Sequence, residues 1–113
     1  MKDDQLYLIH IRECIGRIQQ YAAGSRQDFL GDTKTQDAVL RNLHTMAEST
    51  QHLSPALKAA HPDVDWRAIG GFRNVLVHDY LGINLALVWE IIEQHMPALK
   101  QKVETILASL GKT

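Results

Sequence analysis

Apolar residues recur along most of this chain at alternating intervals of three and four, a spacing that places them on one face of an α-helix. The first series predicts a helix over residues 8–22, which Gly24 and Ser25 end. A second series predicts a helix from about residue 33, and a third predicts a last helix that Gly111 ends. The three series are Leu8, Ile11, Ile15, Ile18 and Ala22; Val39, Leu40, Leu43, Met46 and Ala47; and Leu99, Val103, Ile106, Leu107 and Leu110. No segment shows strand-like alternation, so the pattern predicts an all-α fold.

Residues that can cap a helix mark where the other expected helices begin. Ser54 followed by Pro55 predicts a short helix through Ala60, because proline suits the first helical position. The other expected N-caps are Thr33, in a capping box with Gln36, and Asp65 and Asn84. Residues 28–31 are expected to form a turn. Pro97 is expected either to kink the helix that follows Asn84 or to restart it.

Four long helices with short connections predict an antiparallel four-helix bundle, to which residues 55–60 add a short helix. Gly70 and Gly71 lie inside the helix expected after residue 65, where glycine costs stability unless a neighbour comes close. We therefore expect tight packing at this pair. Leu6, Tyr7 and Ile9 lie outside the apolar face of the first helix, and we expect them to contribute to a homodimer surface.

The composition is that of one soluble domain, which we expect to span residues 1–113. Apolar residues make up 45% of the chain and charged residues 22%, and the formal net charge of −1 gives no overall attraction to phosphate backbones. Cys14 is alone and cannot form an internal disulfide, and residues 1–4 do not resemble a signal peptide. No apolar run is long enough for a membrane span. These features predict a cytoplasmic protein without a membrane role.

The densest group of reactive side chains lies in residues 73–80 and includes Arg73, His78 and Tyr80. On a continuous helix Arg73 and Tyr80 would share one line, whereas His78 would point about 140° away from Arg73. The three groups can converge if the helix ends near Val77 and the chain unwinds after it. This interpretation therefore predicts a helix end at that point.

These residue types suit the cleavage of RNA. An imidazole with a near-neutral pKa can move a proton, and a guanidinium can hold a phosphate through two hydrogen bonds. If His78 takes the proton of a 2′-hydroxyl, that oxygen can attack the adjacent phosphorus without a metal or a cofactor, while Arg73 offsets the developing charge. Asn74 and Asp79 are supporting candidates. The histidines outside the motif show no ligand spacing, so we expect no metal site.

The same residues also have a purely structural interpretation. Arg73 can be a solvated helix charge, His78 a cation at a helix C-terminus and Tyr80 a half-buried anchor. Trp66 and Trp89 lie on apolar stripes and are expected to be core anchors. Spacing alone leaves both interpretations open.

The motif resembles the R-x4-H-x-Y form of the R-x4-6-H signature of HEPN ribonucleases, and the resemblance extends along nearly the whole chain to the HepT-like branch. The stretches that carry it are residues 3–8, 36–43, 53–55, 65–72 and 88–92. Two positions depart from the family pattern, because His44 stands where a glutamate is frequent and Ala47 where a glycine is frequent.

This resemblance implies a helical homodimer with its arginine and histidine in a cleft at the interface, acting as the RNA-cleaving toxin of a toxin–antitoxin pair. It also implies an MntA-like nucleotidyltransferase antitoxin as partner, which transfers AMP from ATP onto the motif tyrosine, here Tyr80. The alternative is a helical protein without enzymatic activity that binds a nucleotidyltransferase through the same motif.

Overall fold

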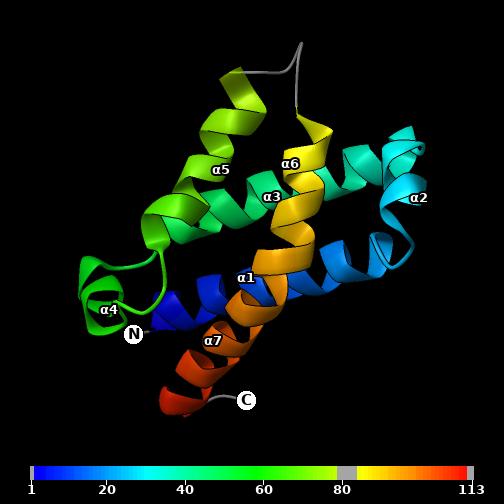
Figure 1. The fold of residues 1–113 in the computed structure, drawn as a ribbon. Helices are drawn as coiled ribbons and strands as arrows, with labels where there is room; N and C mark the ends of the chain where they lie inside the picture. Colours follow the sequence, from blue (N-terminus) through cyan, green and yellow to red (C-terminus); the bar gives the residue numbers. More distant parts are fainter. Residues whose placement is uncertain (1, 79–83, 112–113) are drawn as a thin grey trace.

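The structure is a computed structural model that describes the backbone of residues 2–78 and 84–111 and the side chains of residues 3–72 and 84–111. All regular secondary structure in these residues is helical, which confirms the all-α prediction (Figure 1). The elements are α1 (Lys2–Tyr21), α2 (Arg26–Leu30), α3 (Thr33–Gln51), α4 (Pro55–Ala60), α5 (Trp66–His78), α6 (Leu85–Glu90), η1 (Ile91–His95) and α7 (Met96–Ser109).

Two antiparallel helices, α1 and α3, form the centre of the fold (Figure 1). Helix α5 packs on α3, and α7 packs on α1. Short α2 contacts both α3 and α6. Figure 1 shows α5 and α6 extending away from the α1–α3 pair on the same side of the molecule.

The core consists of the apolar stripes expected from the sequence. Its fully buried members include Leu8, Ile11, Ile15 and Ile18 of α1, Val39, Leu43 and Met46 of α3, and Val103, Ile106 and Leu107 of α7. Ala22, Leu40 and Leu110 are only partly buried and pack against this core. Cys14 is buried among the same residues, and burial raises the pKa of its thiol. A buried, protonated thiol fits a packing role.

Capping explains most helix starts. Ser54 caps α4 by accepting from the backbone N–H of Leu57 at 3.1 Å, and Asp65 and Asn84 cap their helices in the same way, as expected. The start of α3 differs from the prediction, because the N-cap is Asp32 and not Thr33. The Asp32 carboxylate accepts from the N–H groups of Lys34 and Thr35, and these bonds, with one from the Thr35 hydroxyl, lower its pKa.

Residues 28–31, expected as a turn, overlap the second half of the helix α2 and its C-cap Gly31. Ser25 and Asp28 form a reciprocal capping box at its start, each side chain accepting from the other residue's backbone N–H at 3.1 Å. The amide of Gln36 donates to the backbone carbonyls of Phe29 and Leu30 at the end of α2. This bond to α2 replaces the capping role expected for Gln36.

Pro97 lies in the first turn of α7, directly after the π-helical segment η1. A proline removes one backbone N–H and its ring clashes with the carbonyl four residues before it, so a continuous α-helix would be strained here. The wider π-turn precedes this position, and α-helical winding restarts at Met96. As a result α6, η1 and α7 follow one another without a loop (Figure 1).

The close packing expected at the glycine pair is not found. A Cβ atom built on Gly70 or Gly71 would meet no atom within 4 Å, so the pair does not mark a close approach among the residues that the structure describes. Tyr7 and Ile9 are partly buried against the core, and the Tyr7 ring stacks on His52 with a centroid separation of 4.9 Å, whereas their contribution to a homodimer surface stays a prediction. Leu6 does remain 50% exposed.

A buried carboxylate ties α1 to α4. Asp4 is only 4% exposed and accepts from the backbone N–H of Ser54 at 2.8 Å and from its hydroxyl at 2.7 Å. Burial opposes ionisation of Asp4, but the hydrogen bonds from the Ser54 side chain and backbone outweigh it and leave the pKa below its usual value. The ionised carboxylate therefore stabilises the fold.

Replacing Asp4 with asparagine should lower the free energy of unfolding by about 1–3 kcal/mol at neutral pH, because an amide cannot accept both bonds through oxygen atoms. A carboxylate with a lowered folded-state pKa stabilises the fold above its unfolded pKa and loses this contribution as pH falls through the folded one. The difference between the two proteins should thus shrink below about pH 4. Urea denaturation across pH measures it, with Asp3→Asn at the exposed neighbouring position as the control.

Candidate functional site

Three of the five predicted site residues lie near the C-terminal end of α5. Arg73, Asn74 and His78 all have helical backbones in the last two turns of α5, and nothing is described of their side chains. Asp79 and Tyr80 lie outside the described residues. The structure thus shows that Arg73 and His78 belong to the same helix. The convergence of the Arg73, His78 and Tyr80 side chains stays a prediction.

The helix reaches one residue beyond the expected end near Val77, because His78 is still helical. His78 lies five positions after Arg73 on this helix, which corresponds to about 7.5 Å along the axis and about 140° around it. The backbone therefore directs the two positions toward different sides of α5.

The N-terminal half of α5 is firmly anchored. Asp65 accepts from the N–H of Ala68 at 3.0 Å, and the Trp66 indole donates to the carbonyl of His61 at 3.0 Å. Ile69 is buried, and Trp66 packs against the core, as expected. These contacts fix the direction in which α5 carries the motif.

Helix α6 is the first element that the structure describes after the motif in the sequence. Asn84 accepts from the N–H of Leu87 at 3.1 Å and so fixes the start of α6. Trp89 on α6 packs its ring against Phe29 of α2, with 5.6 Å between centroids. Trp89 is thus a core anchor, as expected, and it joins α6 to α2.

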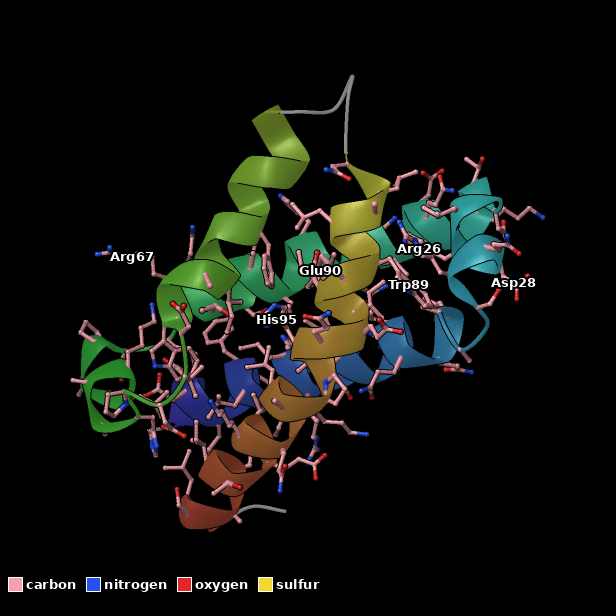
Figure 2. The ribbon with its side chains drawn as sticks, in the orientation of Figure 1. Arg26, Asp28, Arg67, Trp89, Glu90 and His95 are labelled. Atoms are coloured by element: carbon pink, nitrogen blue, oxygen red, sulfur yellow. The ribbon has the colours of Figure 1, made fainter. Side chains whose placement is uncertain are left out.

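A wide polar hollow of about 460 Å³ lies between α2 and α6, next to the start of α6. Its charged lining residues are Arg26, Glu90 and Glu93, and the Trp89 ring also lines it. Figure 2 labels Arg26, Trp89 and Glu90. A guanidinium and an aromatic ring are groups that can contact RNA, but two carboxylates in the same lining oppose a phosphate. The sequence analysis missed this hollow, because Arg26 becomes a neighbour of α6 only through the packing of α2.

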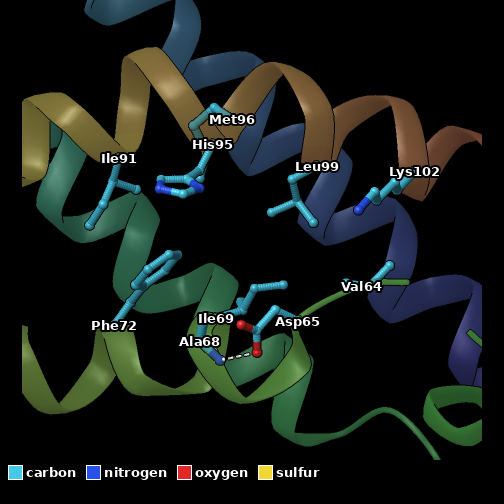
Figure 3. Close-up of a pocket in the computed structure, with 10 residues that line it drawn as sticks. All are labelled: Val64, Asp65, Ala68, Ile69, Phe72, Ile91, His95, Met96, Leu99 and Lys102. Atoms are coloured by element: carbon cyan, nitrogen blue, oxygen red, sulfur yellow. Dashed lines mark hydrogen bonds between the residues drawn. The ribbon is translucent and has the colours of Figure 1, made fainter. Parts of the chain in front are cut away.

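A second, more apolar cavity of about 190 Å³ lies between α5 and the rod formed by η1 and α7 (Figure 3). Phe72, the residue directly before Arg73, borders it on the α5 side. His95 and Lys102 border it on the opposite side. His95 was weighed from the sequence only as a metal ligand and Lys102 was not considered, although their separation by seven positions places them on one face of a helix.

In the part of the chain that the structure describes, no three His, Cys, Asp or Glu side chains are grouped so that they could hold a metal ion. His44 lies 3.8 Å from Glu48 one turn further along α3, a two-residue contact at the position that departs from the family pattern. Within residues 2–78 and 84–111 we find no helix with the length and apolar character that crossing a bilayer requires.

Comparison with known proteins gives a consistent result. The sequence model of the family described as Ribonuclease HepT-like matches residues 11–106. A protein of Thermococcus cleftensis named "Probable ribonuclease HepT" is 34% identical over 101 residues, which cover 88% of this chain and 92% of the relative. An mRNA nuclease HepT of Shewanella oneidensis is 28% identical over 123 residues, which cover 87% of this chain and 91% of the relative.

One relative is much longer than this chain. A Methanocaldococcus jannaschii protein, named as a gamma-glutamylcyclotransferase and predicted RNase, is 30% identical over 112 residues. The match covers 98% of this chain but only 50% of that relative. No solved structure matches the chain at a comparable level of similarity.

Proposed function

The chain belongs to the HepT-like ribonuclease family, and we propose that it is a metal-independent endoribonuclease in which Arg73 and His78 act on the RNA backbone. The family match carries this proposal, since it includes all of α5 and with it the motif. We further propose that the protein is a single domain that works in the cytoplasm as a homodimer, with its helices arranged as a four-helix bundle.

The chemistry follows from the two side chains. The imidazole of His78 removes the proton of a 2′-hydroxyl, and the resulting oxygen attacks the adjacent phosphorus. Arg73 donates two hydrogen bonds to the phosphoryl oxygens, which become more negative as the bond forms. The P–O5′ bond breaks, and the leaving oxygen receives a proton. The products are a 2′,3′-cyclic phosphate and a free 5′-hydroxyl, and water is not consumed in this step.

The helical register of α5 favours a site that two subunits share. Since Arg73 and His78 are about 140° apart around one helix, a phosphate can be reached from both sides more easily when two copies of α5 face each other. Such a cleft contains two histidines, so that one acts as the base and the other as the acid. Leu87, which is 41% exposed on α6, offers an apolar contact for the second copy.

Control by AMP transfer onto Tyr80 completes the proposal, with a nucleotidyltransferase of the MntA-like kind as the antitoxin. An attached AMP adds a negative phosphate and a bulky base next to Arg73. Both would oppose the binding of RNA, so that the modified toxin is inactive.

Purified protein should cleave single-stranded RNA in the presence of EDTA and leave 2′,3′-cyclic phosphate ends that mass spectrometry identifies. A matched oligonucleotide with a 2′-deoxy sugar at the preferred cleavage position should resist cleavage there, because it lacks the nucleophile. Cleavage of the deoxy substrate, or complete loss of activity in EDTA that Mg²⁺ restores, would contradict the proposed chemistry.

A further inference from the structure

The cavity between α5 and the η1–α7 rod has apolar walls. Six apolar side chains from both sides form them: Val64, Ile69, Phe72, Ile91, Met96 and Leu99. Four of these, Val64, Ile69, Met96 and Leu99, are themselves buried, while Phe72 and Ile91 are half-buried. Figure 3 shows Phe72 and Ile69 on one side of the open space and Ile91 and Leu99 on the other. Water inside it would find few polar partners on these walls.

The size of the cavity limits what it can hold. Its volume is about 190 Å³, whereas an engineered apolar cavity of about 150 Å³ in another protein stays dry and binds benzene. One six-membered ring with a short tail therefore fits, and a drug-sized molecule does not.

The polar groups at the rim of the cavity differ between the α5 side and the η1–α7 side. Lys102 donates to the backbone carbonyl of Asp63, which fixes its ammonium group at the rim and leaves two N–H donors for a ligand. On the α5 side, one oxygen of Asp65 is already engaged by the N–H of Ala68. The unengaged donors are thus on the η1–α7 side, where the His95 ring at the end of η1 also faces the open space (Figure 3).

We propose that this cavity binds a small aromatic carboxylate, with its ring between Phe72 and Leu99 and its carboxylate on Lys102. The apolar walls favour the ring because burial removes it from water, and the ammonium of Lys102 selects an anionic tail. The Asp65 carboxylate in the same lining opposes negative charge, and Lys102 offsets one such charge, so that the ligand is a monoanion. This site is separate from the RNA-cleaving motif, and its test does not depend on that motif.

The probe is 3-phenylpropionate. The uncharged control is 3-phenylpropan-1-ol, which has the same ring and chain length. Titration calorimetry at low ionic strength should show the carboxylate binding about three- to fivefold more tightly than the alcohol, the range expected for a partly exposed ion pair. Lys102→Met, which keeps an apolar stem, should remove this preference, and Lys102→Arg should restore it. Lys100→Met on the same helix, outside the lining, should leave it unchanged.

A second variant tests the position of the ring. Ala68 borders the cavity and is exposed, so Ala68→Phe can fill the open space without disturbing the core, and it should weaken both probes at least about tenfold. Equal affinity of Ala68→Phe and the parent protein, or no binding of either probe at millimolar concentration, would overturn the proposal. It would also be overturned if Ala68→Phe dissociated a dimer in sedimentation experiments while the probes failed to bind, because a second subunit would then occupy the cavity.

Discussion

Replacing His78 with alanine should reduce the rate of RNA cleavage about 10²- to 10⁴-fold, the usual contribution of a general acid or base. The imidazole is the group in the motif that can both accept and donate a proton near neutral pH. If two subunits share the cleft, one substitution removes the base and the acid together, which favours the upper end of this range. The rate on a fluorescent RNA oligonucleotide under single-turnover conditions measures the loss.

The matched control is His61→Ala, because His61 lies in the loop before α5 and only its backbone carbonyl bonds to Trp66. It should retain cleavage within about twofold of the parent rate, since no catalytic proton is assigned to it. Arg73→Lys keeps the charge but loses the two-pronged hydrogen bonding, so its rate should fall between those of the parent and of His78→Ala. Undiminished cleavage by folded His78→Ala protein would refute the catalytic assignment and favour the non-enzymatic alternative.

Tyr80→Phe should abolish the transfer of AMP by the antitoxin, because the phenolic oxygen is the proposed nucleophile. In the proposed transfer this oxygen attacks the α-phosphorus of ATP, pyrophosphate leaves, and the phenolic proton is released. Incubation of the parent protein with antitoxin and ATP should raise its intact mass in steps of one AMP, and the phenylalanine variant should gain no such step.

Tyr21→Phe is the control for this experiment, since Tyr21 is 42% exposed at the end of α1 and has no proposed role. It should acquire AMP as the parent does. Cells that carry Tyr80→Phe should remain intoxicated when the antitoxin is present, because the block cannot form. An unchanged mass increase on Tyr80→Phe would place the modification on another residue.

The sequence was a good guide to local structure. The apolar stripes predicted α1, α3 and α7, and Ser54, Asp65 and Asn84 are the N-caps that they were expected to be. Local signals sufficed here because helix periodicity and capping depend on residues within one or two turns. The helix α2 was missed although Ser25 and Asp28 carry its capping signal, because the helix is only one turn long.

Contacts between distant segments were predicted less well. The hydrogen bond that the Ser54 backbone N–H donates to Asp4 joins residues 50 positions apart, and no local sequence pattern predicts it. Gly70 and Gly71 suggested a close neighbour, yet the described structure has open space there, because the same glycine pattern arises with or without a partner. The existence of the cavity depends on the distance between α5 and α7, and the packing of the side chains between the helices sets this distance.

Sequence by itself determined the helical class, most helix boundaries, the family and the candidate residues Arg73, His78 and Tyr80, since each depends on residue type and spacing along the chain. Only the tertiary structure decided that α5 remains helical through His78, that Asp4 holds α4 against α1, and that Phe72 and Lys102 border one cavity. The reason is physical: periodicity fixes which face of a helix is apolar, whereas the separation of two helices depends on every side chain packed between them.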